Sequence, residues 1–315
     1  MIPIFDERPW GVRDLRPVYT KIVNQPIGES WLTWEDSRVA NGPLAGQSLA
    51  DLSRTYGRDL IGQLACYENR FPLLVKFLFP GDKLSVQVHP DDEGAKRKGH
   101  PCGKTECWYV LRAQPGAQVA LGLKPDVTLE EFRRSIEANR AEELLNWVEV
   151  SAGDMIYVAA GTVHTIGGGM VLVETQQTSD ITYRLYDYGR PRELHVEDGL
   201  AATKLRTRAG KVVRAADDSS NVLVRSPFFQ VEKMPLRESL KAATTPDSPH
   251  ILVAVSGAGV VESRSMEPVG FATGEAIVVP ASVGEYTVRP QWELEMMRMS
   301  LPIGAVTEPE TKSTQ

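Results

Sequence analysis

The sequence predicts a mainly β protein made of two β-lobes, with a small helical insertion in the first lobe. Short apolar runs that end at Gly, Pro or Asp recur along most of the chain, as is typical of a β-sandwich or barrel. At 315 residues with 42% hydrophobic content, the chain can bury one large core or two smaller ones. A turn–strand–turn pattern at residues 153–164 recurs at residues 274–285, which indicates an internal repeat.

The individual elements follow from residue periodicity. Alternating apolar and polar residues, or short apolar runs, predict strands at residues 84–90, 103–111, 153–164 and 171–176. Apolar residues at helical spacing predict helices at residues 48–64 and 129–147. The polar stretch 206–221 is expected to connect the two lobes, and the polar tail from residue 307 is expected to be disordered.

Four polar residues on the predicted strands form a candidate metal site: Gln87, His89, Glu106 and His164. Successive side chains of a strand point to opposite faces, so Gln87 and His89 project from the same face. Two imidazoles, one carboxylate and one amide oxygen suit a borderline divalent ion, and Zn2+ at one ion per chain is the leading candidate. The alternative for each histidine is a hydrogen-bonded core or surface role.

The internal repeat predicts how the two lobes are related. When the two copies are aligned, His164 becomes Glu285 and Glu106 falls near His250. We interpret the chain as a tandem of cupin-type (jelly-roll) β-barrels in which the second has lost the ligand set, while chance similarity of two β-turn units is the alternative. The expected domains are residues 1–205 with a helical insertion near 126–148, a metal-free domain at 222–303, and a polar tail at 304–315.

The composition argues against several classes of function. A formal net charge of −6 without a dominant basic face argues against nucleic-acid binding. No apolar run approaches the length of a membrane span, and the first eight residues do not resemble a signal peptide. The three cysteines lack close pairing, which favours reduced thiols. We therefore expect a cytoplasmic enzyme, in which an anionic substrate would need a local cluster of cations.

The same strand segments carry a family resemblance. Several long motifs, in the family's order, are similar to type I mannose-6-phosphate isomerase in its short bacterial form: residues 71–76, 84–92, 103–109, 172–180 and 182–188. The resemblance begins at residues 9–11 and 27–31, is dense to about residue 200 and is weak beyond it. Because the motifs are long and ordered, the match is far more specific than a short pattern.

The resemblance implies a zinc-dependent aldose–ketose isomerase that interconverts mannose 6-phosphate and fructose 6-phosphate by proton transfer through an ene-diolate. It places the family's catalytic arginine on Arg184, the lysine near the metal glutamate on Lys104 and the buried pocket lysine on Lys76. Glu174 matches a pocket acid. Glu174, Lys104 and Lys76 are all candidates for the proton-shuttling base. On spacing alone, a structural salt bridge between Glu174 and Arg184 is an equally good interpretation.

The resemblance also implies how the substrate is held. Trp10 and Glu29 match the rim of the family's pocket, and Arg190 takes the place of a family lysine suited to phosphate. The implied partner is a small sugar phosphate, bound by a monomer or homodimer that has no nucleic-acid or membrane partner.

The chain departs from the family pattern in three places. Larger members carry a histidine directly before the lysine near the metal glutamate, where this chain has Gly103, so that histidine cannot open the sugar ring here. Ala159 replaces a proline that often precedes the second metal histidine. The large helical domain of the eukaryotic enzymes has no room, and residues 129–147 are its expected reduced counterpart.

Two functions of other classes stay open at this stage. Two histidines and one carboxylate also suit the iron of a cupin dioxygenase, in which case Gln87 would be a bystander. A non-catalytic sugar-phosphate-binding regulator would keep the fold without turnover, although an intact Arg184, Lys104 and ligand set argue against it.

Overall fold

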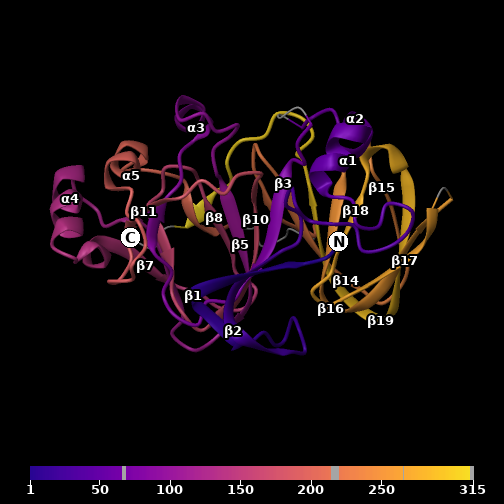
Figure 1. Ribbon diagram of the computed structural model, residues 1–315, viewed down its shortest axis with the longest axis horizontal. Helices are drawn as coiled ribbons and strands as arrows, with labels where there is room; N and C mark the ends of the chain where they lie inside the picture. Colours follow the sequence, from indigo (N-terminus) through magenta and orange to yellow (C-terminus); the bar gives the residue numbers. More distant parts are fainter. Residues whose placement is uncertain (66–68, 214–219, 265, 313–315) are drawn as a thin grey trace.

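The computed structural model describes residues 1–65, 69–213, 220–264 and 266–312, and its described part is mainly β, as the sequence predicts. Three antiparallel sheets account for the strands (Figure 1). The first has eight strands in the order β1 (Ile4–Asp14), β2 (Ile22–Trp31), β3 (Leu73–Leu78), β10 (Met170–Gln177), β5 (Glu106–Ala113), β8 (Met155–Val158), β12 (Ala209–Val212) and β20 (Thr311–Lys312).

The second sheet packs face to face on the first and completes the first jelly-roll lobe. Its five strands run in the order β11 (Tyr183–Tyr186), β4 (Val86–Val88), β9 (His164–Ile166), β6 (Gln118–Leu123) and β7 (Leu145–Glu149). Apolar side chains from both sheets form one buried cluster between them, including Trp108 and Leu172 from the first sheet and Val119 and Ile166 from the second. This packing leaves one end of the lobe for polar side chains.

The third sheet forms the second lobe. It runs β13 (Val222–Arg225), β14 (Gln230–Leu236), β19 (Glu285–Ser300), β16 (His250–Ser263) and β17 (Met266–Ala272), with β15 (Leu240–Ala243) on β19 and β18 (Ala276–Val279) on β16. The predicted repeat is visible in the backbone, because Gly153 before β8 and Gly274 before β18 both have positive φ, at 97° and 87°. The turn–strand–turn pattern is therefore confirmed in both lobes.

Short helices lie outside the sheets: α1 (Leu49–Tyr56), α2 (Arg58–Ile61), α3 (Asp92–Arg97), α4 (Leu129–Glu137) and α5 (Val196–Ala202), with 3-10 turns η1 (Ala141–Leu144) and η2 (Ala281–Val283). The predicted helix at 48–64 is divided by Gly57, whose φ is 48°. No helix of the described residues has both the length and the apolar character needed to cross a membrane.

The predicted helix at 129–147 is correct only in its first half. Thr128 closes a capping box with Glu131 and starts α4, but the helix ends at Glu137. Asn139 then takes a left-handed conformation with φ 56°, which reverses the chain. Leu145–Glu149 becomes strand β7, so the pattern of apolar residues near Leu145 belonged to a strand and not to a helix.

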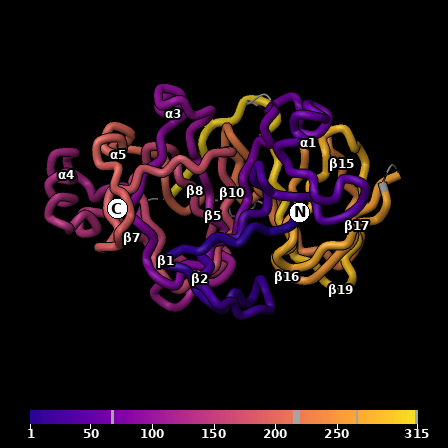
Figure 2. Tube along the Cα trace, viewed as in Figure 1, coloured from indigo at the N-terminus to yellow at the C-terminus, as the bar shows by residue number. Residues whose placement is uncertain are grey.

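Two segments that the sequence left unstructured contribute strands. The expected connector 206–221 contains β12, which pairs with β8, while its residues 214–219 lie outside the described part. The tail, expected to be disordered, contains β20, which pairs with β12 through Lys312 and Thr311. Figure 2 shows the last part of the chain running from the second lobe back to the first. The two lobes are thereby joined at more than one point.

The central strands β3, β5 and β10 are buried on both faces. Along β3, Leu73, Val75 and Phe77 belong to a large core that also contains Phe229 and Val253 of the second lobe. The alternate residues of these strands face the five-stranded sheet. Charged residues at these alternate positions therefore point into the first lobe.

Candidate active site

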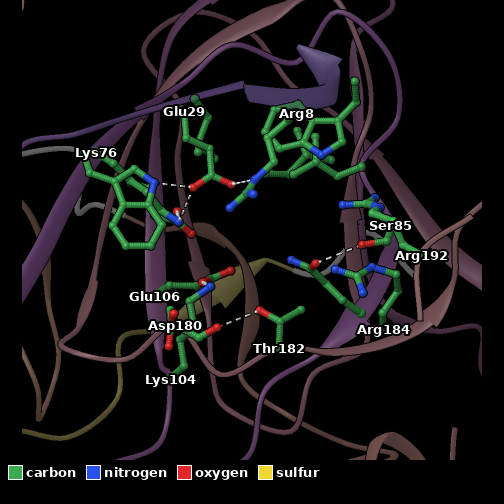
Figure 3. A pocket seen from close by; sticks show the side chains of 17 residues that line it. Arg8, Glu29, Lys76, Ser85, Lys104, Glu106, Asp180, Thr182, Arg184 and Arg192 are labelled. Carbon is green, nitrogen blue, oxygen red and sulfur yellow. Dashed lines mark hydrogen bonds and ion pairs between the residues drawn. The ribbon is translucent and has the colours of Figure 1, made fainter. Parts of the chain in front are cut away.

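A cavity of about 260 Å³ opens between the two sheets of the first lobe. Its walls combine both sheets, and Figure 3 shows the polar side chains that converge on it. The charged and amide residues that line it are Arg8, Glu29, Lys76, Gln87, Lys104, Glu106, Glu174, Asp180, Arg184 and Arg192. Trp10, Trp31, Leu78, Leu84 and Ile166 supply apolar wall. Such a mixture suits a small polar ligand.

A three-residue cluster with metal-ligand chemistry adjoins this cavity through Glu106, which lines it. The ligand atoms of His89, Glu106 and His164 all lie within 4.8 Å of one another, and each residue is about 1% exposed. His89 Nε2 is 3.5 Å from Glu106 Oε2, and His164 Nε2 is 3.3 Å from Glu106 Oε1. The cluster spans both sheets, because Glu106 begins β5 while His164 begins β9.

Both imidazoles are held in the form that binds a metal. His89 Nδ1 donates to the carbonyl oxygen of Ile181 at 2.8 Å, and His164 Nδ1 donates to that of Thr162 at 2.9 Å. These bonds leave the Nε2 lone pairs directed at Glu106. Burial lowers the pKa of His164 to about 4, and burial together with Lys104 lowers the pKa of His89 well below its usual value. Both rings are therefore neutral at pH 7.

The positive charge of Lys104 only partly compensates the burial of the Glu106 carboxylate. Burial and the adjacent Glu174 raise the pKa of Glu106. Lys104 Nζ lies 3.0 Å from its Oε2, yet that buried oxygen accepts no hydrogen bond of good geometry from the described residues. A divalent cation between Glu106 and the two imidazoles would satisfy this oxygen. The donor set of two neutral histidines and one carboxylate fits Zn2+.

Gln87 lies beside the cluster. It is paired in register with His164, and its Nε2 lies 3.2 Å from His164 Nε2. Its Oε1 instead accepts from Ser85 Oγ at 3.2 Å. Rotation of the amide by half a turn would present Oε1 to the cluster, as a fourth ligand requires.

A second charged group lies on the eight-stranded sheet. Lys76 and Glu174 are directly opposite each other on β3 and β10. Lys76 Nζ lies 2.9 Å from Glu174 Oε2 and 3.2 Å from Glu29 Oε2. Glu174 Oε1 also accepts from Trp108 Nε1 at 3.1 Å. The ion-pair partner of Glu174 is therefore Lys76, whereas the salt-bridge interpretation paired it with Arg184. Lys76 on β3 and Trp108 on β5, the two strands that flank β10, thus fix the Glu174 carboxylate in the cavity wall.

Eight of the eleven predicted site residues line the cavity, whereas His89, His164 and Arg190 are not among the described lining residues. His89 and His164 adjoin the cavity through Glu106. Lys104 Nζ lies 3.1 Å from His89 Nε2, and Arg184 is paired in register with Gln87. Trp10 and Glu29 line the cavity as well, while their role at a substrate rim stays a prediction. Arg190 is absent from the described lining: it pairs with Asp82 at 2.7 Å and Asp187 at 3.3 Å. The phosphate role of Arg190 stays a prediction, because its guanidinium pairs with two carboxylates and is not part of the described cavity lining.

Two cavity arginines were not among the predicted site residues. Arg8 lies on β1 two residues before Trp10, so strand alternation could have placed it on the same face. Arg192 follows β11 in an irregular segment, where no periodicity predicts its direction. The departure at Gly103 is steric as well as chemical, because a Cβ there would lie 2.5 Å from the carbonyl carbon of Asp91.

Comparison with known proteins agrees with this geometry. A family model described as phosphomannose isomerase type I, catalytic domain, matches residues 14–121. The mannose-6-phosphate isomerase ManA of Bacillus subtilis strain 168 is 36% identical over 301 residues, covering 90% of this chain and 93% of that protein. A mannose-6-phosphate isomerase of Streptococcus mutans serotype c is 36% identical over 293 residues, covering 87% of this chain and 89% of that protein.

A solved structure gives the same result. The crystal structure of mannose 6-phosphate isomerase from Bacillus subtilis matches with a TM-score of 0.83 at 29% identity, covering 95% of this chain and 98% of that one. Sequence relatives and fold thus agree over nearly the whole length, including the second lobe. The chain therefore belongs to the type I phosphomannose isomerase family.

Proposed function

We propose that this protein interconverts mannose 6-phosphate and fructose 6-phosphate with one zinc ion per chain. The observation that carries the proposal is a single cavity in which the His89–Glu106–His164 cluster meets Lys104 and Glu174. Membership in the type I phosphomannose isomerase family supplies the substrate class.

The reaction moves a carbonyl group between C1 and C2 of the sugar. A proton leaves the carbon beside the carbonyl and returns one carbon over, and the intermediate ene-diolate carries the costly charge. Zn2+ bound by His89, Glu106 and His164, with Gln87 as a weaker fourth ligand, would supply Lewis-acid polarisation of sugar oxygens. Arg184, whose guanidinium is always protonated, adds a fixed positive charge for the same species.

The proton shuttle falls to Glu174 or Lys104, which both line the cavity. Lys76 is the weaker candidate. Burial opposes its charge, but Glu174 and Glu29 outweigh burial and raise the pKa of Lys76 overall. A lysine held as an ammonium between two carboxylates cannot accept a proton, so its role is to fix the charge and position of Glu174.

Trp10 and Glu29 shape the rim around the sugar. Glu29 accepts from Arg8 Nε on β1 at 3.1 Å, from Trp31 Nε1 on β2 at 2.7 Å and from Lys76 Nζ on β3 at 3.2 Å. Side chains from three strands therefore hold its carboxylate. We further propose that the second lobe completes the fold without binding metal, and that the protein acts in the cytoplasm as a monomer or homodimer.

The test is a coupled assay for fructose 6-phosphate formed from mannose 6-phosphate, run before chelation, after chelation and after zinc addition. Activity should be lost and then restored. His164→Ala should abolish activity and lower bound zinc, measured by mass spectrometry, while the circular dichroism spectrum stays that of a folded protein. His100→Ala is the matched control, because His100 is exposed in a loop and should keep metal and activity.

Full metal occupancy in a folded His164→Ala variant would contradict the metal site. Consumption of dioxygen by the purified protein without isomerase activity would instead favour the iron-dependent alternative.

A further inference from the structure

Three arginines line the cavity, and two of them, Arg8 and Arg192, have no role in the chemistry described above. Arg8, Arg184 and Arg192 come from β1, from β11 and from the segment after β11, and the charges of Arg8 and Arg192 both act on Arg184. In Figure 3, Arg184 and Arg192 lie together on one side of the cavity, and Lys104 and Glu106 lie on the other. Arg184 and Arg192 thus lie across the cavity from Glu106, the residue of the metal cluster that lines it.

Two of these arginines are fixed by neighbouring carboxylates. Arg8 Nη2 lies 2.7 Å from Asp6 Oδ2, and its Nε lies 3.1 Å from Glu29 Oε1. Arg192 donates to both oxygens of Asp187, at 2.6 and 2.7 Å. Anchoring of this kind orients a guanidinium before a ligand arrives, which lowers the entropy cost of binding.

Arg184 is less completely satisfied. Its Nη1 donates to the carbonyl oxygen of Glu193 at 2.8 Å, but its buried Nε has no partner among the described residues. Burial lowers the pKa of Arg184, and the positive charge of Arg192 adds to the effect. Arg8 and Arg192 thus both disfavour the charge on Arg184, and an anion bound among the three guanidinium groups would offset that repulsion.

We propose that Arg8 and Arg192 form the clamp that binds the substrate's 6-phosphate, in place of Arg190. This inference rests on the proposed function for the identity of the substrate. Guanidinium groups bind phosphate oxygens through paired N–H donors, and two anchored groups from separate segments fix both position and orientation. With the phosphate held by Arg8 and Arg192, the sugar carbonyl is directed past Arg184 toward the metal cluster.

The clamp predicts a particular kinetic pattern. A phosphate carries the same charge in the ground state and the transition state, so losing a clamp residue should raise KM and leave kcat within about threefold. A charge-assisted hydrogen bond contributes roughly 10- to 100-fold in affinity. Arg8→Gln and Arg192→Gln should therefore each raise KM for mannose 6-phosphate at least tenfold, and Arg8→Lys should fall between wild type and Arg8→Gln.

The experiment measures binding and turnover separately. Isothermal titration calorimetry with inorganic phosphate gives the affinity of each variant without catalysis, and steady-state kinetics gives KM and kcat. Arg13→Gln is the matched control, because Arg13 lies on the same strand as Arg8 but is exposed outside the cavity. Arg190→Gln separates the two assignments of phosphate, and thermal unfolding of every variant identifies any loss of fold.

Weaker phosphate binding in Arg8→Gln and Arg192→Gln, with Arg190→Gln like wild type, supports the clamp. Unchanged KM and phosphate affinity in both clamp variants, or a rise in KM confined to Arg190→Gln, overturns it. If wild type binds phosphate but does not isomerise mannose 6-phosphate, and the two variants lose that binding, the clamp stands while the proposed function fails. The experiment thus distinguishes failure of the phosphate clamp from failure of the proposed function.

Discussion

Replacing Lys76 by methionine tests the buried charge group in the cavity wall. Lys76 is 7% exposed in its side chain and lies within 3.2 Å of two carboxylates, those of Glu29 and Glu174. The substitution keeps an unbranched side chain, one heavy atom shorter, and removes its charge. Both carboxylates then remain buried, with Glu29 still held by Arg8 and Glu174 by an indole N–H.

Removing one partner of a buried ion pair typically costs about 3–5 kcal/mol, because it leaves an uncompensated charge. We expect Lys76→Met to lie near the lower end, about 3 kcal/mol, because Arg8 continues to neutralise Glu29. The free energy of unfolding is measured by urea titration at pH 7. Lys233→Met is the matched control: Lys233 makes a partly exposed ion pair with Glu295, so its loss should cost less than about 1 kcal/mol.

The pH dependence gives a second, independent readout. Burial alone would raise the pKa of Glu29, but Lys76 and Arg8 reverse this and lower it. A lowered carboxyl pKa contributes stability above the unfolded value of about 4.5, and that contribution is lost as pH falls through the folded value. The penalty in Lys76→Met should therefore be full at pH 7 and shrink below pH 4.5. A penalty below about 1 kcal/mol at pH 7 would refute the reasoning.

Two further predictions concern catalysis and acid stability. Arg184→Ala should lower kcat by roughly 100-fold with KM nearly unchanged, as for loss of an oxyanion donor; if steady-state kinetics showed only a higher KM, Arg184 would belong to the phosphate clamp. His250 donates or accepts at 2.8 Å with Tyr286, and burial followed by Arg298 lowers the pKa of His250 to about 4. Between pH 6.5 and 4 the unfolded chain binds the extra proton, so wild type should lose about 2 kcal/mol from this group between pH 7 and pH 5. His250→Gln should lose correspondingly less in urea titrations at the two pH values, and an equal loss in both proteins would contradict the assignment.

The convergence of the metal cluster could be predicted because its determinants are local. Strand alternation places Gln87 and His89 on one face, and long motifs locate Glu106 and His164. The direction of Arg190 could not be predicted in this way. It follows Gly189, whose φ is 78°, in a segment beyond β11 where the period of two no longer applies. Arg190 pairs with Asp82, far away in the sequence, and is not among the described residues that line the cavity.

The wrong prediction of a helix over residues 145–147, which begin strand β7, has a similar origin. Leu144 and Leu145 fit the apolar face of a helix as well as the start of a strand, because a short apolar pair carries no period of its own. Pairing of β7 with β6, through Val148 and Val119 among others, decides between the two. Pairing with β6 therefore determined that residues 145–149 form a strand, which the local pattern left open.

The core shared by the two lobes has a consequence for how the cavity is aligned. On β3, Val75 and Phe77 pack toward the second lobe, while Lys76 between them faces the cavity. A slip of one residue would exchange these faces, pushing an ammonium group into the apolar interface and aromatic carbon into the cavity. Packing against the second lobe thus helps to fix the register of β3 in the first lobe. A cavity-creating substitution such as Phe229→Ala, made without touching any cavity residue, could misalign the charged groups that the reaction requires.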